Sequence, residues 1–125
     1  MTEEKQETIL YMCTCGEDRA ETAHMPFVLA NAALAMDIQA TIVLQGDGVR
    51  IATPGFAEAM PAGGGFPPLK KLLDDFMEQG GKMWVCGPCI KHRGIEESEL
   101  IDGAEVTAAG SVNLAALEAN AVFVF

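Results

Sequence analysis

Short apolar runs, separated by segments with a helical pattern, constrain the fold of this chain more than any other feature. Runs of this length are typical of strands that are covered on both faces of a sheet. The predicted strands are Thr8–Met12, Ala40–Leu44, Lys82–Val85, Glu105–Ala108 and Ala121–Phe125. Because strands that alternate with helices form parallel βαβ units, we predict a three-layer αβα domain with a mostly parallel five-stranded sheet.

The segments between these strands carry the spacing of helices. Met25–Met36 is almost entirely apolar, and Pro26 stands where a first helical turn tolerates proline. Leu69 to Phe76 repeats its large apolar residues at i, i+3, i+4 and i+7, which predicts an amphipathic helix. Ser111 is the expected N-cap of a helix that ends near Glu118.

The segment Ala62–Pro68 is rich in glycine and proline. Fixing a residue costs roughly 1 to 2 kcal/mol of conformational entropy, and few apolar side chains here offset that cost. The segment follows the second strand and precedes the amphipathic helix. We therefore expect a mobile flap, at the edge of the sheet where the third strand ends. Val49–Thr53 is expected to be a short extended piece.

Charge and hydropathy exclude several classes of partner. The chain has 18 acidic and 8 basic residues, a net charge of −10, which repels phosphate backbones and anionic lipid surfaces. We expect no direct nucleic acid partner and no membrane partner. No apolar run reaches the roughly 18 to 20 residues of a membrane helix, and residues 1–5 are polar rather than a basic leader. A cytoplasmic location is the expectation.

Four cysteines follow two of the predicted strands. Cys13 and Cys15 come after the first strand, and Cys86 and Cys89 come after the third. The carboxyl ends of parallel strands meet at one edge of a sheet, where sites gather. In a cytoplasmic protein such thiols are reduced and serve chemistry or metal binding more often than disulfide bonding. Cys13 and Cys15 are equally explained as small, semi-buried residues that close a strand.

Three chemistries fit these residues. The pKa of Cys86 could be lowered by the nearby Lys91, His92 and Arg93. The Cys86 thiolate would then accept a sulfur atom, and Cys89 would later attack the persulfide and release that sulfur. Cys-Gly-Pro-Cys is also the spacing of a thioredoxin-like thiol/disulfide redox site. In the thioredoxin fold, however, the motif follows the first strand of the core. Cys-x-Cys together with Cys-x-x-Cys supplies the four thiolates of a closed zinc or iron–sulfur site. His24 is expected to face the same edge as Cys86.

The sequence resembles the DsrE/DsrF-like family, which includes TusD-like sulfur-relay subunits and YchN-like proteins. The resemblance rests on Met25-Pro26-Phe27 at the alanine-rich helix, on Leu44-Gln45-Gly46-Asp47-Gly48-Val49, and on Val85-Cys86 with Arg93-Gly94-Ile95 downstream. It implies one DsrE/DsrF-like domain over residues 1–125, with a flavodoxin-like (YchN-like) fold.

The resemblance also implies a function. It indicates a sulfur carrier or sulfurtransferase that holds a persulfide on Cys86, the cysteine at the end of a central strand. Cys89 is the second expected catalytic thiol, with His92, Arg93 and His24 in support and Cys13 and Cys15 as additional thiols. No cofactor or bound metal is expected. The implied partners are sulfur donor and acceptor proteins, in a homotrimer or homohexamer. The chain departs from many relay subunits by its second cysteine, Cys89.

Overall fold

The structure is a computed structural model that describes residues 6–125 and is built on one parallel sheet. The strand order is β4-β3-β2-β1-β5, and every neighbouring pair is parallel. The strands are β1 (Thr8–Cys13), β2 (Gln39–Leu44), β3 (Lys82–Cys86), β4 (Ala104–Thr107) and β5 (Ala121–Val124). The predicted parallel five-stranded sheet is confirmed. The expectation for residues 1–5 lies outside the described residues.

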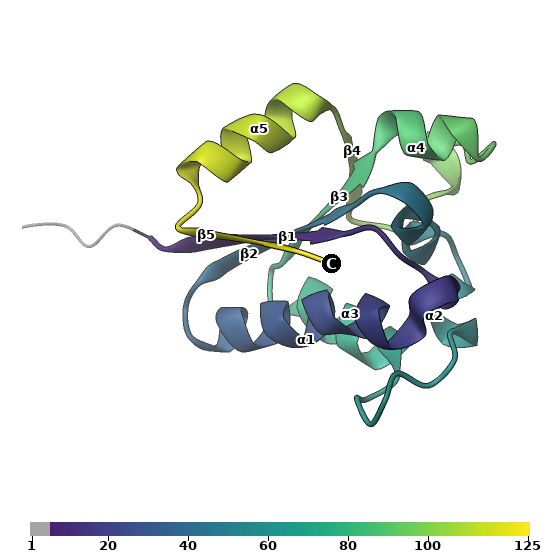
Figure 1. Cartoon of the computed structure of the whole chain (residues 1–125), viewed down its shortest axis with the longest axis horizontal. Coiled ribbons are helices and arrows are strands. Elements are labelled where there is room, and N and C mark those ends of the chain that lie inside the picture. Colours follow the sequence, from purple (N-terminus) through teal and green to yellow (C-terminus); the bar gives the residue numbers. More distant parts are fainter. Residues whose placement is uncertain (1–5) are drawn as a thin grey trace, which may run out of the picture.

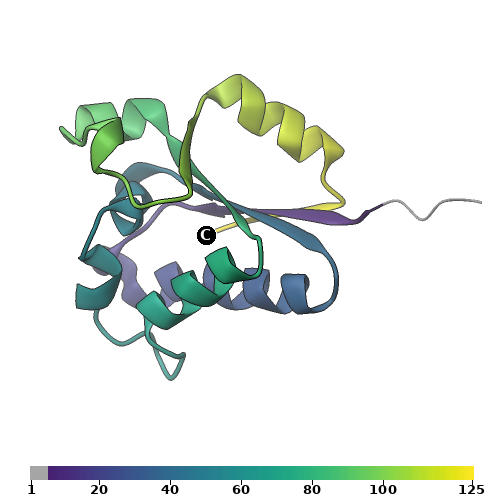
Figure 2. The same cartoon turned by 180° about the vertical axis from the view of Figure 1, so that it is seen from behind.

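Helices cover both faces of the sheet. Helices α1 (Ala20–Ala35) and α3 (Leu69–Glu78) lie on one face, with the short α2 (Phe56–Ala59) beside them. Helix α5 (Ala109–Glu118) and the short α4 (Gly87–His92) lie on the other face. Figures 1 and 2 show this separation from opposite sides. The three-layer αβα fold is therefore confirmed.

The core lies between the sheet and the layer of α1 and α3. Tyr11 and Ile42 of the sheet are buried there, and Phe27 of α1 meets Phe76 of α3 edge to face, with ring centroids 6.0 Å apart. Each large apolar side chain buried in this way contributes roughly 1.5 to 3 kcal/mol. Helix α5 has no buried residue, and Leu114 on it is 62% exposed. The second face of the sheet is thus only loosely covered.

Three local expectations about helices are wrong. Helix α1 begins at Ala20, so Pro26 lies inside the helix instead of in its first turn. Residues such as alanine and glutamate favour the helix upstream of Pro26, and this proline removes a single backbone donor. Helix α5 begins at Ala109, which leaves Ser111 inside it. Residues Gly46–Ala52 form a 3₁₀ helix where an extended piece was expected.

The glycine segment is packed against the start of α1. Gly63 is buried, and a Cβ atom on it would collide with the His24 ring. The Phe66 ring stacks on His24 with centroids 6.5 Å apart. In both cartoons the segment hangs below α1 and α3, whereas α4 lies above the sheet (Figures 1 and 2). The expected flap beside Cys86 is therefore wrong in its position, because the aromatic contacts of Phe66 and His24 hold the segment elsewhere.

The sequence predicted that no segment of the chain forms a membrane helix. Within residues 6–125 the structure contains no helix that is both long enough and apolar enough to span a bilayer.

Candidate functional site

The cysteines lie at the carboxyl edge of the sheet as two separate pairs. Strand β1 ends at Cys13 and strand β3 ends at Cys86, and β2 runs between these two strands. All four side chains are free thiols. Cys13 and Cys15 are buried, whereas Cys86 and Cys89 are partly exposed. The second pair is therefore the one that a reaction partner can reach.

Helix α4 begins directly after Cys86 and brings Cys89 back toward it. Pro88 stands in the first turn, where a helix tolerates its missing N–H. The loop after β2 reaches the same place, because the backbone N–H of Gly46 donates to the Cys89 sulfur over 3.4 Å. Two partly buried thiols and a backbone donor thus meet beyond the ends of β2 and β3.

The surroundings of Cys86 favour its protonated form. Burial raises the pKa of the Cys86 thiol, and a hydrogen bond with the Cys89 side chain raises it further. The backbone N–H of Cys89 and the positive charge of Arg93 act in the opposite direction with smaller effect. The expectation that neighbouring cations lower this pKa is therefore wrong in its net direction, and a smaller fraction of Cys86 is ionised at neutral pH than of an ordinary cysteine.

Arg93 ties α4 to the loop after β2. Its Nε and Nη2 atoms each lie 3.0 Å from Oδ1 of Asp47. Its Nη1 donates to the Cys89 carbonyl over 3.2 Å. Because Asp47 neutralises much of its charge, Arg93 positions Cys89 more than it activates Cys86. Lys91 and His92 are exposed on α4.

Cys13 and Cys15 form the second pair, which is closed to solvent. Cys15 is 2% exposed, and its pKa is lowered to about 7 by a hydrogen bond from the Cys13 thiol. The same hydrogen bond, together with burial, raises the pKa of Cys13. Gly48 fits closely over this pair, because a Cβ there would strike the Cys13 carbonyl. The pair therefore contains an acidic thiol with little access.

The four cysteines do not form the metal site that their number suggested. Within residues 6–125, no group of three or more histidine, cysteine, aspartate or glutamate side chains is close enough to hold a metal ion. Cys13 faces the core on one side of the sheet, and Cys86 begins the helix on the other. The alternative that joins all four thiolates thus has no support in this arrangement.

His24 lies away from the exposed thiols. Its ring is fully buried on α1, and Nδ1 lies 2.6 Å from the Ala20 carbonyl. The geometry assigns a hydrogen on Nδ1 that donates to this oxygen. Nε2 has no hydrogen-bond partner in the described part of the chain. Since neither ring nitrogen reaches a cysteine, the expected support of Cys86 by His24 is not formed.

Gly46 and Asp47 are site residues that the sequence indicated only as part of the family resemblance and to which it gave no role in the site. They supply the donor to Cys89 and the carboxylate to Arg93. The Gly46-Asp47-Gly48 run after a predicted strand was the available signal, since turns at that edge of a parallel sheet build sites. Its pairing with Arg93 spans 46 positions, which the sequence pattern alone does not reveal.

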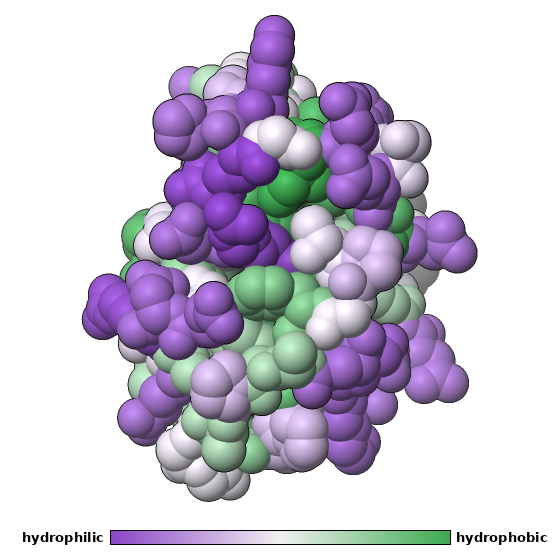
Figure 3. All heavy atoms as spheres, turned by 90° about the vertical axis from the view of Figure 1, so that its right-hand side faces the viewer, coloured by the Kyte–Doolittle hydropathy of each residue, from purple (hydrophilic) through white to green (hydrophobic). Residues whose placement is uncertain are grey.

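The carboxyl-end face of the molecule has an apolar centre. Figure 3 looks onto this face and shows apolar side chains in its middle, with hydrophilic side chains along both sides. An apolar centre with a hydrophilic rim is typical of surfaces that bind a partner.

Comparison with known proteins gives the family. The model of the DsrE/DsrF-like family matches residues 8–125. Uncharacterized protein MJ0760 of Methanocaldococcus jannaschii is 35% identical over 107 residues, which are 84% of this chain and 38% of the relative. Uncharacterized protein MJ0989 of the same organism is 37% identical over 91 residues, 73% of each chain.

A solved structure shares the fold. The crystal structure of the ychN protein from E. coli superimposes with a TM-score of 0.73 and 19% identity, and the match covers 96% of this chain and all of that one. The likeness to ychN concerns the fold alone. Among the sequence relatives, the chain spans only 38% of the length of MJ0760. The family match nevertheless extends from the first strand to the last residue. The chain belongs to the DsrE/DsrF-like family.

Proposed function

We propose that this protein carries sulfur as a persulfide on Cys86 and passes it to a partner in a sulfur relay. The observation that supports this most is the partly exposed thiol pair of Cys86 and Cys89 at the end of an interior strand, in a chain of the DsrE/DsrF-like family. This role agrees with the sulfur-relay association of the family. ychN shares this fold, and the uncharacterized relatives carry no assigned chemistry.

The loading step conserves atoms and charge. The Cys86 thiolate attacks the terminal sulfur of a donor persulfide, whose S–S bond breaks. The donor leaves as a thiolate and takes the proton that Cys86 gave up. Cys86 then carries one extra sulfur, which an acceptor thiol can remove by the same exchange.

Cys89 offers a second way to release the sulfur. Its thiolate can attack Sγ of the loaded Cys86, which expels hydrosulfide and leaves a Cys86–Cys89 disulfide. A thiol reductant must then supply two electrons to restore the pair. The N–H of Gly46, 3.4 Å from the Cys89 sulfur, holds that sulfur at the end of β2 close to Cys86.

The raised pKa of Cys86 suits a carrier. An unloaded Cys86 that stays protonated reacts slowly with stray electrophiles. Loading therefore requires that a proton acceptor take the Cys86 proton as the donor thiolate leaves, and release requires an acceptor thiolate that attacks the terminal sulfur of the loaded Cys86.

A dithiol/disulfide oxidoreductase is the second candidate, because the Cys86 and Cys89 thiols interact directly. Intact mass separates the candidates after the reduced protein is treated with a sulfane-sulfur donor, with metal content measured in parallel. We expect a metal-free protein that gains one sulfur atom. Because the Cys89 release route also ends in a disulfide, the deciding sample is the Cys89→Ser variant: its failure to gain sulfur would favour the oxidoreductase, and about one bound zinc or iron per chain would contradict both candidates.

We also propose a cytoplasmic homo-oligomer, a trimer or hexamer, that docks donor and acceptor proteins. Free thiols persist in a reducing compartment. Leu117 of α5 is 82% exposed and Val124 of β5 is 71% exposed. Strand β5 is also an edge of the sheet, so one side of its backbone can pair with another chain.

Light scattering tests the assembly. We expect a mass near three or six times 13.3 kDa at micromolar concentration. Substitution of Leu117 by Lys should shift this mass toward the monomer, whereas the same change at the exposed Glu78 of α3 should not. A mass of 13.3 kDa for the unmodified protein would contradict the proposal.

A further inference from the structure

A hollow lies between α5 and the sheet, on the same side of the sheet as α4. Its volume is about 670 Å³, and a second hollow of about 320 Å³ adjoins it at the amino-terminal edge of the strands. The two share Thr8, Gln39, Thr41 and Lys82 among their lining residues. Together they have the size of a site for a small organic molecule.

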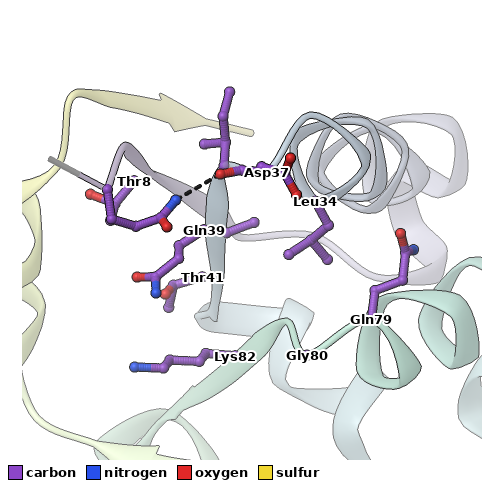
Figure 4. A pocket seen from close by; sticks show the side chains of 11 residues that line it. Thr8, Leu34, Asp37, Gln39, Thr41, Gln79, Gly80 and Lys82 are labelled. Carbon is purple, nitrogen blue, oxygen red and sulfur yellow. Dashed lines mark hydrogen bonds between the residues drawn. The ribbon is translucent and has the colours of Figure 1, made fainter. Parts of the chain in front are cut away.

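Polar groups of β2 and β3 project into this space. Figure 4 shows the side chains of Gln39, Thr41 and Lys82 extending to one side of their strands. The Lys82 ammonium has no carboxylate within 4.0 Å among residues 6–125. Among residues 6–125, Lys82 is the only cation that lines either hollow, while Asp37 lines the smaller hollow and Glu118 the larger one, so an anionic group of a ligand has Lys82 as its partner.

The remaining walls suit an apolar segment and a positive charge. Trp84 lies on the floor, and Leu114 reaches in from α5 while remaining 62% exposed. Ser111, Leu114, Ala115 and Glu118 have the spacing of one helix face. Glu118 supplies a carboxylate for an ammonium on the ligand. The hollow therefore matches a zwitterionic molecule with an apolar middle.

Cys86 lines neither hollow and lies beyond Trp84, which is the last residue of β3 in the lining. Alternate residues of a strand share a face, so Lys82, Trp84 and Cys86 form one row on β3. At about 3.3 Å per residue, the Cα atoms of Lys82 and Cys86 are about 13 Å apart. A molecule of tripeptide length that anchors a carboxylate near Lys82 can bring a sulfur atom close to the Cys86 thiol.

We propose that this hollow, the α5 cavity, binds a carboxylate-bearing thiol of tripeptide size and receives its persulfide as the sulfur donor for Cys86. The inference rests on the proposed persulfide function and adds the class of donor. The step is the exchange described above. Cys86 forms a bond to the terminal sulfur, the S–S bond of the donor breaks, and the free thiol departs with the proton of Cys86.

The test compares two donors with the same peptide skeleton and thiol that differ in the charge of their carboxyl groups. Glutathione persulfide carries the carboxylates, and the persulfide of glutathione diethyl ester lacks their charge. We expect the charged donor to load the protein about fivefold faster, since Lys82 is exposed and an exposed ion pair contributes at most about 1 kcal/mol. The Lys82→Gln variant should lose this preference. The Lys71→Gln variant, which removes the same charge from α3, should keep it.

Binding without reaction separates this inference from the proposed function. Reduced glutathione should bind the Cys86→Ser variant in calorimetry, and adding Lys82→Gln should weaken that binding about fivefold. Equal loading by both donors in the unmodified and Lys82→Gln proteins would overturn the inference while leaving persulfide chemistry at Cys86 intact. Binding that depends on Lys82, with no sulfur transferred from glutathione persulfide to Cys86, would keep the site but overturn its role as a donor site, whereas the absence of loading by every sulfane-sulfur donor would overturn the proposed function.

Discussion

The Cys86→Ser variant is expected to lose persulfide loading completely, whereas Cys89→Ser is expected to load as fully as the unmodified protein and to hold the sulfur longer. Serine cannot form a persulfide, and without Cys89 no thiol in the pair can displace the bound sulfur. Intact mass after treatment with a sulfane-sulfur donor gives the extent of loading, and peptide mapping gives its position. The time course of sulfur loss compares the two proteins.

Cys15 is the other thiol that could take up the sulfur in this experiment. Its pKa of about 7 makes it more ionised at neutral pH than Cys86, whose pKa is raised. Ionisation alone would therefore direct sulfur to Cys15. However, Cys15 is only 2% exposed, and attack on a donor requires access as well as charge. The Cys15→Ser variant should load normally, and sulfur that maps to Cys13 or Cys15 would show that the site is wrongly assigned.

The fold should survive the Cys86 substitution. The side chain is partly exposed at the end of β3, and serine is nearly the same size. Surface-type substitutions of this kind change stability by about 0.5 kcal/mol. A melting temperature close to that of the unmodified protein establishes that the lost loading reflects chemistry.

The sheet was predictable because its strands are defined by local sequence. Apolar runs at Thr8–Cys13 and Gln39–Leu44 form interior strands of the sheet, and an interior position of this kind leaves a pattern in the sequence itself. Leu69 and Phe76 likewise follow the helical repeat and are buried as predicted. The placement of both cysteine pairs at one edge followed from parallel topology.

The contacts within the site were not predictable in the same way. The pairing of Arg93 with Asp47 joins positions 46 apart, and only the folded chain brings them together. The short α4 lacks an amphipathic repeat long enough to be recognised. Nearby cations in the sequence also suggested an acidic Cys86, although Asp47 holds Arg93 and burial dominates the pKa.

The glycine segment shows how composition can mislead. Glycines predict high conformational entropy, and the sequence offers no sign that Gly63 meets a helix. The contact is with His24, a residue 39 positions earlier that was expected to serve the cysteines. A glycine can mark a flexible loop or a place where another group approaches closely, and only packing distinguishes the two.

Replacing Gly63 with Ala is expected to destabilise the protein by about 1 to 3 kcal/mol, the usual cost of overfilling a packed site. The added Cβ would collide with the His24 imidazole, which is itself fully buried and fixed at Nδ1 by the Ala20 carbonyl. The backbone at Gly63 is not in the left-handed region, so the effect is steric. Denaturant unfolding measures the change, and Gly110→Ala is the control because nothing lies near its added Cβ.

The cost should fall in a protein that already carries His24→Ala, since the colliding ring is then absent. A double-mutant cycle with an interaction energy of about 1 kcal/mol or more would identify the imidazole as the cause. The amide of Phe66, which donates to the Gly63 carbonyl over 3.2 Å, should also be protected from hydrogen exchange in the unmodified protein and lose protection in Gly63→Ala. If Gly63→Ala is as harmless as Gly110→Ala and the Phe66 amide exchanges freely, the segment moves independently of α1, and the mobile loop indicated by its composition is the better description.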